Sequence, residues 1–459
     1  MWRSWFAAVL SSAFAACGGA EETLVAALRG SAQPSRGAWA PGLMGAGLGT
    51  DFVVMVDFGS SGSRLFVYLV ERPTFNLQVV GKFDFEALAT FANRAHEAKA
   101  VIQRSVVASY TAIADAQQRK QTPIYAFATA GMRLLPEDVS VPLWVSVREA
   151  LRSTEYKFSD VSHARTMSGD LEGVYQWVTV NQLLGSEGRR EHRGILELGG
   201  ASLQAAFEPA TNLQMIMQSE FRFRHVAPSG RWEDISLYAD SWLGFGSNEA
   251  LSRLLTFLFE SGTTTNPCFN LGFERNATLY GHTSSNVTVL FTGSGEPSRC
   301  SELVRRSLIH SDWECIQKPC GIAGRYFPQP GDAKYIGVSG FFHTPVNLNL
   351  MQGHEAKAVP LNRIIAKTEE LCALTPEQVA DNPDFNHTSW ERFQWQTCFT
   401  GHLHYWVLRS FGFTDEGETI EYRDKIHGED VTWTQGGVLY EAAEDLNRGG
   451  ALSGRILRV

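Results

Sequence analysis

The chain has 459 residues, which is too long for one ordinary domain and fits two or three. Its composition, 44% hydrophobic and 19% charged, is that of a globular protein and excludes a disordered or fibrous chain. The formal net charge of -9 argues against nucleic acid as a partner, because a phosphate backbone requires clustered Lys and Arg. Small anionic ligands that carry their own metal ion remain compatible with this charge.

The N-terminus has the pattern of a secretory signal peptide. A basic residue near the start precedes a short apolar core, Trp5 to Ala16, with small residues at its end. The core is too short to span a bilayer comfortably, so we expect cleavage near Ala16 to Ala20, leaving residues 1–20 as the signal and residues 21–50 as a flexible leader. An uncleaved anchor is the alternative. No later stretch is apolar enough to cross a membrane, which predicts a secreted chain or one in the lumen of the secretory pathway.

Residues 52–70 are predicted to form a β-hairpin with an acidic tip. An apolar run ends at Asp57, a turn of Gly and Ser follows, and a second apolar run begins at Leu65. Glycines let the backbone approach an anion, hydroxyl and N–H groups donate hydrogen bonds, and a carboxylate can hold a hydrated divalent cation. Such a tip suits the phosphates of a metal–nucleotide complex.

Between residues 98 and 151 the pattern predicts two helices, at 98–118 and 141–151, and a strand at 124–129. The strand ends in the motif Ala128 to Arg133, which puts a hydroxyl and a flexible turn where ligands commonly sit in α/β sheets. A plain strand-to-helix turn is the alternative.

A further helix is predicted at 170–184, with Ser168 placed to cap it and Gly185 to end it. Its apolar residues cluster on one face: Val174, Trp177, Val178 and Leu184. At about 100° per residue, Glu172 points largely away from that face. A carboxylate that faces a cleft can act as a general base on water. An acidic residue that merely complements the helix dipole is the alternative.

Residues 194–207 repeat the design of the first hairpin. An apolar strand carries Glu197, a Gly-Gly-Ala-Ser turn follows at 199–202, and an apolar strand returns. Two ordinary hairpins that need glycine for turn geometry are the alternative. The repetition favours two lobes that grip phosphates from opposite sides, which requires Asp57 and Glu197 to converge.

Six of the seven cysteines lie in the second half of the chain. An even number of cysteines in a secreted chain predicts disulfides. We favour sequential pairing, Cys268–Cys300, Cys315–Cys320 and Cys372–Cys398. A zinc site is the competing interpretation, but no His or Cys pair matches the Cys315/Cys320 spacing.

Three N-glycosylation sequons fall in the same half, at Asn276, Asn286 and Asn386. They agree with secretion. Helices are also predicted at 248–260 and 360–374, and at 437–446 after a turn at 433–437. The alternation of strands and helices indicates an α/β or α+β architecture with a cleft between lobes.

The order of these motifs resembles the conserved regions of the nucleoside triphosphate diphosphohydrolases, the ecto-apyrases. The matching segments are 57–64 (DFGSSGSR), 129–133 (TAGMR), 169–181 (GDLEGVYQWVTVN), 198–204 (LGGASLQ) and 433–436 (WTQG), with 238–246 and 266–268 as further likenesses. The resemblance implies the two-lobed actin-like α/β fold of sugar kinases and chaperone ATPases, with a central cleft. It also implies hydrolysis of nucleoside tri- and/or diphosphates. Lobe I would comprise residues 51–168 with 432–459, and lobe II residues 169–431.

The resemblance assigns roles residue by residue. Glu172 falls on the general base that deprotonates the attacking water, and Ser202 and Gln204 fall on residues that orient this water. Asp57 and Glu197 match the acids that hold Ca²⁺ or Mg²⁺ through coordinated waters. The donors that cradle the phosphates match Ser60, Ser61, Gly62, Ser63, Thr129, Gly200 and Ala201. The implied mechanism is direct attack by water, without a phospho-enzyme.

Three positions depart from the family pattern: Glu197 replaces a usual Asp, Leu203 a usual Thr and Gln435 a usual Leu. None of these changes removes a group that the mechanism requires, so we still expect activity. The longer side chain of Glu197 could alter the metal preference or the rate. For stacking on the nucleobase, the resemblance offers Phe342 or His343, whereas Phe341 is expected in the core.

Two other functions are compatible with parts of the pattern. A kinase with the same fold would use the same phosphate hairpins, but secretion, disulfides and Glu172 in its motif argue against it. A catalytically silent protein could keep nucleotide affinity. Such a relative would often lose Glu172 or Gln204, and this chain has both.

Overall fold

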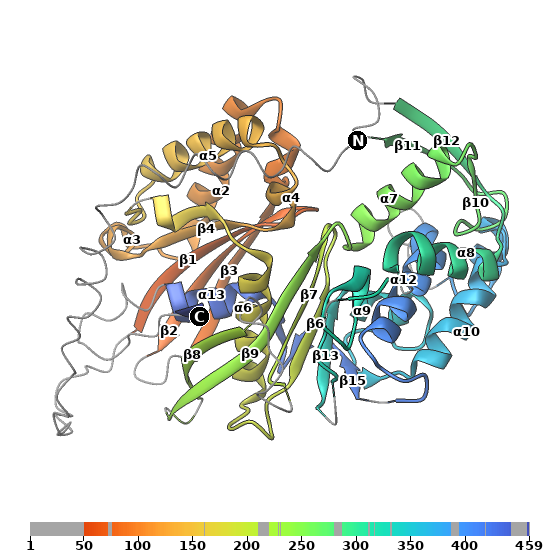
Figure 1. The fold of residues 1–459 in the computed structure, drawn as a ribbon. Coiled ribbons are helices and arrows are strands. Elements are labelled where there is room, and N and C mark those ends of the chain that lie inside the picture. Colours follow the sequence, from red (N-terminus) through yellow and green to blue (C-terminus); the bar gives the residue numbers. More distant parts are fainter. Residues whose placement is uncertain are drawn as a thin grey trace, which may run out of the picture. The chain divides into compact units, whose positions relative to one another are not determined.

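Two large β-sheets with flanking helices organise the protein in this computed structural model (Figure 1). The described residues are 50–458, except 72–75, 160, 210–219, 228, 230, 280–286, 311–312, 316, 331–332, 387–393, 418 and 442–456. The predicted signal peptide at 1–20 and nearly all of the leader at 21–50 therefore lie outside them. Both sheets belong to the unit Gly47–Val459. The division into lobes at 51–168 with 432–459 and at 169–431 stays a prediction.

The first sheet has five strands in the order β3-β2-β1-β4-β5. The strands are β1 (Thr50–Phe58), β2 (Ser63–Glu71), β3 (Asn76–Phe85), β4 (Ile124–Ala128) and β5 (Ala164–Thr166). β1 and β2 pair antiparallel, which confirms the predicted hairpin, and β4 lies parallel to β1. The predicted strand at 124–129 is confirmed as β4.

Both faces of the inner strands β1 and β4 are buried over residues 53–58 and 124–128, whereas the edge strand β3 is exposed at alternate residues. Val54 and Val56 of β1 pack in one core with α2 (Ala95–Ala108) and α5 (Glu137–Arg152). Val53 and Met55 pack on the other face against Trp433 of α13 (Trp433–Glu441). Because neighbours along a strand point to opposite faces, a strand covered on both sides reads as a continuous apolar run. This explains why β1 has no polar alternation.

The helix predicted at 98–118 is wrong. α2 ends at Ala108, a 3₁₀ turn (Ser109–Thr111) follows, and α3 is a separate helix (Ala116–Gln121). Asp115 caps α3 by accepting a hydrogen bond of 2.8 Å from the backbone N–H of Gln117. Ile113, in the connection, is buried in the core. The aspartate cap and the burial of Ile113 break a segment whose composition favours one continuous helix.

The second sheet has eight strands in the order β14-β15-β13-β6-β7-β9-β8-β18. They are β6 (Gly194–Leu198), β7 (Ser202–Phe207), β8 (Glu220–Val226), β9 (Trp232–Leu243), β13 (Tyr335–Ser339), β14 (Lys357–Ala358), β15 (Ile420–Tyr422) and β18 (Leu457–Arg458). β6, β13 and β15 are parallel neighbours, whereas β6, β7, β9 and β8 pair antiparallel in that order, with β9 between β7 and β8. The second predicted hairpin is confirmed as β6 and β7.

Helices pack against both faces of the second sheet. On one face lies α6 (Gly169–Leu184), and a larger core on the other face gathers α7 (Ser247–Glu260), α9 (Gly340–Asn347), α10 (Leu361–Cys372) and α12 (Thr397–Ser410). The shorter helices are α4 (Ala130–Arg133), α8 (Pro297–Val304) and α11 (Pro376–Asp381). A small sheet with the order β10-β12-β11 comprises Thr265–Asn266, Val287–Gly293 and Glu274–Leu279, and a ribbon pairs β16 (Lys425–Ile426) with β17 (Glu429–Asp430).

The helices predicted at 141–151, 170–184, 248–260 and 360–374 are confirmed as α5, α6, α7 and α10. Gly185 ends α6 in the left-handed conformation (φ 67°), as expected, but the side chain of Ser168 makes no capping hydrogen bond. α12 escaped prediction because it is buried on almost all sides and has no polar face. Among the described helices, none combines the length and the hydropathy that crossing a membrane requires.

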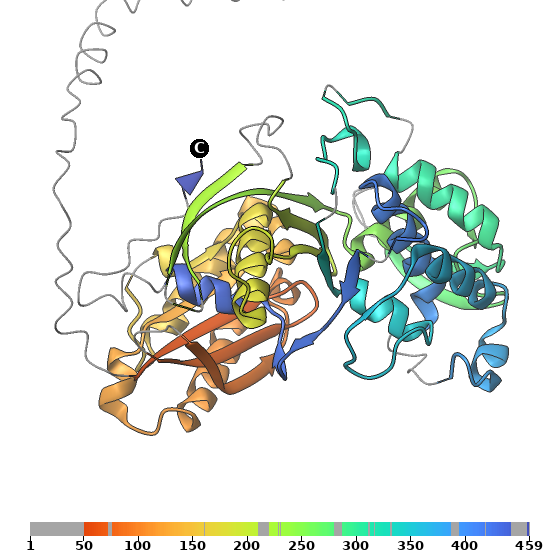
Figure 2. The same cartoon turned by 90° about the horizontal axis from the view of Figure 1, so that it is seen from below.

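The predicted turn at 433–437 is wrong, because these residues form the first turns of α13. α13 lies beside α6 (Figures 1 and 2), and the two backbones touch. A β-carbon on Gly436 would lie 2.2 Å from the carbonyl oxygen of Tyr175. Thr179 strengthens the crossing by accepting a hydrogen bond of 2.9 Å from the N–H of Gly436. Residues 442–446 of the predicted helix lie outside the described residues.

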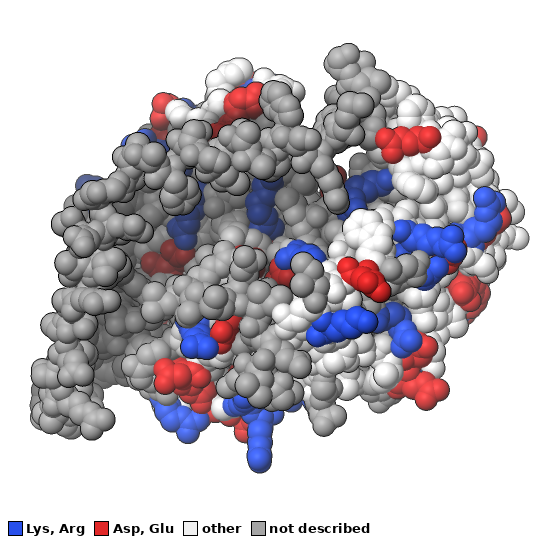
Figure 3. All heavy atoms as spheres, in the orientation of Figure 1, with Lys and Arg blue, Asp and Glu red and all other residues white. Residues whose placement is uncertain are grey.

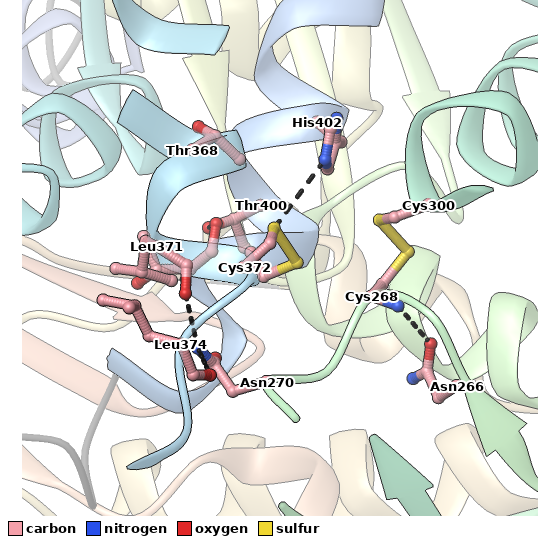
Figure 4. The surroundings of a disulfide bond; sticks show 12 residues. Asn266, Cys268, Asn270, Cys300, Thr368, Leu371, Cys372, Leu374, Thr400 and His402 are labelled. Carbon is pink, nitrogen blue, oxygen red and sulfur yellow. Dashed lines mark hydrogen bonds between the residues drawn. A yellow bond between two sulfur atoms is a disulfide. The ribbon is translucent and has the colours of Figure 1, made fainter. Parts of the chain in front are cut away.

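The three predicted disulfides are confirmed: Cys268–Cys300, Cys315–Cys320 and Cys372–Cys398. The first and third lie close together, with His402 beside the third (Figure 4). Within the described residues, Cys300, Cys398 and His402 are the one His/Cys/Asp/Glu group with metal-ligand spacing. Both cysteines are oxidised, so the zinc interpretation is wrong here. Burial lowers the pKa of His402 to about 3, which keeps this ring neutral.

Gly436→Ala is expected to destabilise the protein by about 1–3 kcal/mol, because the new methyl group would collide with rigid backbone. Gly437→Ala is the matched control on the same helix. Its β-carbon would meet the flexible end of Met55 and the ring of Trp433, each at 3.3 Å, and alanine has the better helix propensity. Urea unfolding of both variants measures the difference. Equal midpoints would show that the crossing does not depend on the missing side chain.

Candidate active site

The tips of the two predicted hairpins meet. Ser60 lies in the β1–β2 turn, and a β-carbon on Gly200, in the β6–β7 turn, would lie 2.7 Å from the Ser60 hydroxyl oxygen. Gly131, which follows β4, approaches the same turn, since its β-carbon would lie 3.0 Å from the Ser60 Cα. Three turns from distant parts of the sequence therefore converge at Ser60. Gly131 and Gly200 can come this close because neither carries a side chain.

Three carboxylates lie close to this junction. Asp57 stands near the end of β1 and Glu197 near the end of β6, while Glu172 lies in the first turn of α6. Asp57 and Glu172 are buried. The charge of Glu172 raises the pKa of both Asp57 and Glu197, and the charge of Asp57 raises the pKa of Glu197. The structure thus brings together the acids that the sequence placed about 115–140 residues apart (57 and 172, 57 and 197).

Burial raises the pKa of Asp57 to about 7, although Arg64, whose Nη1 lies 3.6 Å from Oδ2, and Trp433 oppose this shift. Burial likewise raises the pKa of Glu197 to about 8, and the negative charges of Glu172 and Asp57 add to it. The Ser339 hydroxyl donates a hydrogen bond of 3.1 Å to Glu197 Oε1, which acts in the opposite direction. Asp57 and Glu197 therefore have too little positive charge nearby to keep their pKa values in the ordinary range.

The two acids fit a divalent cation. Oδ1 of Asp57 and Oε2 of Glu197 are buried and have no hydrogen-bond partner among the described residues. A buried carboxylate oxygen without a partner is costly. Hard oxygen ligands of this kind are those that Ca²⁺ and Mg²⁺ prefer, directly or through coordinated water. The donor set therefore matches the predicted metal.

Glu172 is the centre of a hydrogen-bonded network. Arg133 Nη2 donates to Glu172 Oε2 at 2.8 Å and to the Ser202 hydroxyl at 3.0 Å. Gln204 Nε2 donates to Ser202 and, at 3.3 Å, to Glu172 Oε2. Burial raises the pKa of Glu172, and the guanidinium of Arg133 opposes this. The predicted base and both predicted water-orienting residues thus belong to one contiguous group.

The sheet and α6 hold this network in place. Gln204 on β7 faces Ser241 on β9 in the strand register, and Gln204 Nε2 donates to the Ser241 hydroxyl at 3.2 Å. A β-carbon on Gly169 would lie 2.2 Å from the Ser241 hydroxyl oxygen. The first turn of α6 therefore rests directly on the end of β9. This contact fixes the position of α6 on the sheet, and with it the position of Glu172 relative to Gln204.

Four residues of the site received no role from the sequence: Arg133, Ser241, Ser339 and Trp433. Arg133 and Trp433 stood inside quoted motifs, so the signal was present, but nothing local shows that either side chain reaches a carboxylate. Ser241 also stood inside a quoted segment, 238–246, but its place beside Gln204, like that of Ser339 beside Glu197, follows only from the pairing of β9 with β7 and of β13 with β6.

The predicted phosphate donors fall into two groups. The β1–β2 turn contains Ser60, Ser61 and Gly62, and the β6–β7 turn contains Gly200 and Ala201. Thr129 follows β4, and its N–H donates a hydrogen bond of 3.2 Å to the Phe58 carbonyl. The Ser63 hydroxyl instead donates to the Glu86 carbonyl at 2.7 Å. Its expected contribution as a hydroxyl donor is therefore not supported, because this hydroxyl is bonded to the residue that follows β3.

The two candidates for stacking on a base differ in exposure. Phe342 is buried with Phe341 in the large core, whereas His343 is exposed at the solvent side of α9. A ring in the core has no free face for a ligand. Of the two residues, His343 alone keeps the accessibility that stacking requires.

The chain matches the model of the GDA1/CD39 (nucleoside phosphatase) family over residues 49–449. It is 27% identical over 431 residues to ectonucleoside triphosphate diphosphohydrolase 1 of Bos taurus, covering 84% of this chain and 80% of that protein. It is 29% identical over 323 residues to the Golgi apyrase of Schizosaccharomyces pombe, covering 63% of this chain and 54% of that protein.

Among solved structures, a nucleoside triphosphate hydrolase from Neospora caninum superposes with a TM-score of 0.62 at 14% identity. The match covers 85% of this chain and 92% of that one. This likeness confirms the expected α/β fold of the actin-like class. The family match over most of the sequence shows that the chain is an enzyme of the GDA1/CD39 (nucleoside phosphatase) family.

Proposed function

We propose that the protein removes terminal phosphates from nucleoside tri- and/or diphosphates by direct attack of water, with Glu172 as the general base. One observation carries the proposal: Glu172, Ser202 and Gln204 form a single buried network beside two converging hairpin turns. The names of the relatives, a triphosphate diphosphohydrolase and an apyrase, support this substrate class.

The network orients Glu172 for proton transfer at one oxygen. The hydrogen bonds that Glu172 accepts from Arg133 and Gln204 both end on Oε2. Oε1 is then the atom that takes the proton of the attacking water. Its raised pKa makes Glu172 a stronger base than an ordinary glutamate. The guanidinium of Arg133 opposes this rise.

Ser202 and Gln204 would position the water. The Ser202 hydroxyl receives hydrogen bonds from Arg133 and Gln204, so its own proton is free to point toward a water or a phosphate oxygen. Gln204 Oε1 is buried without a hydrogen-bond partner among the described residues, and it is therefore ready to accept one from that water. These groups hold a nucleophile in line with the phosphate, which lowers the entropic part of the barrier.

Asp57 and Glu197 would hold Ca²⁺ or Mg²⁺ through coordinated waters. A bound cation would supply charge that offsets the negative charge of the phosphoryl group. The N–H groups of the two turns, around Ser60 and Gly200, would contact the phosphates. Backbone donors of this kind are already in place before the substrate binds.

We further propose that the protein works in the lumen of the secretory pathway or outside the cell. The three disulfides, the three sequons and the signal-like N-terminus support this location, because disulfides persist in oxidising compartments. One of its relatives is a Golgi apyrase.

Glu172→Gln is expected to lower the rate of phosphate release by about 10²–10⁴-fold, the usual contribution of a general base. Nucleotide binding should persist, because the amide keeps the shape of the side chain. Glu137→Gln, an exposed acid in the first turn of α5, is the matched control and should retain full activity. Phosphate release and nucleotide binding are measured on the same samples. Full turnover by the Glu172→Gln variant would remove Glu172 from its role.

Removal of Arg133 should shift the pH dependence of kcat. Arg133→Met takes away the positive charge that lowers the pKa of Glu172, so this pKa rises and the acidic limb of kcat moves to higher pH. Arg133→Lys keeps the charge and should restore most of the original limb. A purely structural role would instead reduce kcat by the same factor at every pH.

Metal affinity should increase as the pH rises through about 7 to about 8, where Asp57 and Glu197 lose their protons in the folded protein. A cation binds the ionised forms. The metal-free protein loses stability earlier, as the pH rises from the ordinary pKa values of 3.8 and 4.5 to about 7 and about 8, because over that range the folded state holds protons that the unfolded state has released. Calorimetric titration with Ca²⁺ and with Mg²⁺ measures this.

Asp57→Asn should flatten the pH dependence of metal binding, and EDTA should stop phosphate release by the unmodified protein. Glu197→Asp, which restores the residue usual in the family, tests whether the longer side chain sets the metal preference. An affinity that is independent of pH would show that these carboxylates do not hold the metal.

A further inference from the structure

The β11–β12 hairpin has one face toward the core and one toward solvent. On the inner face, Leu279 and Phe291 are buried, and Ala277 and Val289 pack against the large core. The outer face is formed by the cross-strand pairs Glu274–Thr292, Asn276–Leu290 and Thr278–Thr288. Side chains that alternate along each strand produce this separation. The outer face of the hairpin is therefore a defined surface, with known neighbours for each residue.

The sequon at Asn276 lies wholly on the outer face. Asn276 and Thr278 are two residues apart on β11, so both point to solvent, and both are exposed. The Thr278 hydroxyl lies 3.4 Å from that of Thr288 on the opposite strand. Of the other sequons, Asn286 lies outside the described residues. Asn386 is described and exposed, but its Thr388 is not described.

Leu290 is an unusual residue for this position. It is 46% exposed and lies directly opposite Asn276, while the other residues of the outer face are polar. β11 is also an edge strand, since the order of the small sheet is β10-β12-β11. In Figure 3 this part of the surface is mostly uncharged but carries an acidic group. The charged residues of β11, Glu274 and Arg275, lie at its start, before Asn276. An exposed apolar side chain on an edge hairpin is a site for unwanted strand pairing.

We propose that Asn276 carries an N-linked oligosaccharide whose first sugar lies over Leu290 and protects this edge of the sheet. The proposal rests on the lumenal location proposed above. The Asn276 amide nitrogen forms a bond to the anomeric carbon of the sugar, the bond from that carbon to the pyrophosphate of the lipid-linked donor breaks, and the amide proton leaves to solvent. The apolar C–H face of a pyranose can cover a leucine side chain and remove apolar area from water.

The first test maps the modification on the full chain exported from eukaryotic cells. Peptide-N-glycosidase treatment in heavy-oxygen water converts a glycosylated Asn276 into labelled Asp, which mass spectrometry detects. Thr278→Ser should keep the modification and Thr278→Ala should lose it, whereas Thr288→Ala perturbs the same hairpin but leaves the sequon intact. Exported, disulfide-bonded chain with unlabelled Asn276 overturns this inference and leaves the location standing. Chain that stays in the cytosol overturns both.

The second test asks whether the sugar covers Leu290. Asn276→Gln should increase binding of a hydrophobic dye and aggregation, while phosphate release per folded molecule stays unchanged. Leu290→Thr should reverse that increase in the Asn276→Gln background and have little effect when the sugar is present. Asn386→Gln serves as the control for loss of a different sequon. Equal effects of Leu290→Thr in both backgrounds would show that the sugar does not lie on Leu290.

Discussion

The convergence of three carboxylates, Asp57 and Glu172 buried and Glu197 partly buried, is the constraint on which the site depends. Burial raises the pKa of Asp57, Glu172 and Glu197, and their mutual repulsion adds to this for Asp57 and Glu197. Within the described structure, the nearby cations that oppose these shifts are Arg64 and Arg133. Uncompensated buried charge is expensive, so the three carboxylates can all be ionised together only when a cation binds.

The framework that maintains this convergence is made of close approaches at glycine. Gly200 allows the two hairpin turns to touch and Gly169 lets α6 rest on β9, each against a serine hydroxyl, whereas Gly436 lets α13 cross α6 against backbone. Contacts this close leave little freedom for adjustment, because the packed interior has no room for an added side chain. The carboxylates are thus carried by strands and helices whose mutual positions are fixed, as a preorganised site requires.

The second half of the chain supports this site from outside. Its core packs α7, α9, α10 and α12 on the side of the sheet opposite α6, and two disulfides lie within that core. Ser339, whose hydroxyl donates a hydrogen bond to Glu197, directly precedes α9, which packs in this core. The β11–β12 hairpin lies at the margin of the same core and exposes the sequon. Stability and surface protection are therefore supplied by a region that has little part in the chemistry.

The sequence by itself determined the two hairpins, most of the longer helices, the disulfide partners and the identity of the predicted base. These features are local, or they follow from a motif order that resembles one family. The break between α2 and α3 and the early start of α13 were missed, because a buried Ile113 and a buried Gly436 override local propensity. Only the tertiary structure decided that Arg133 and Ser241 join Glu172 and Gln204, and that Ser63 turns toward Glu86. Side-chain direction depends on neighbours distant in sequence, and no local pattern contains that information.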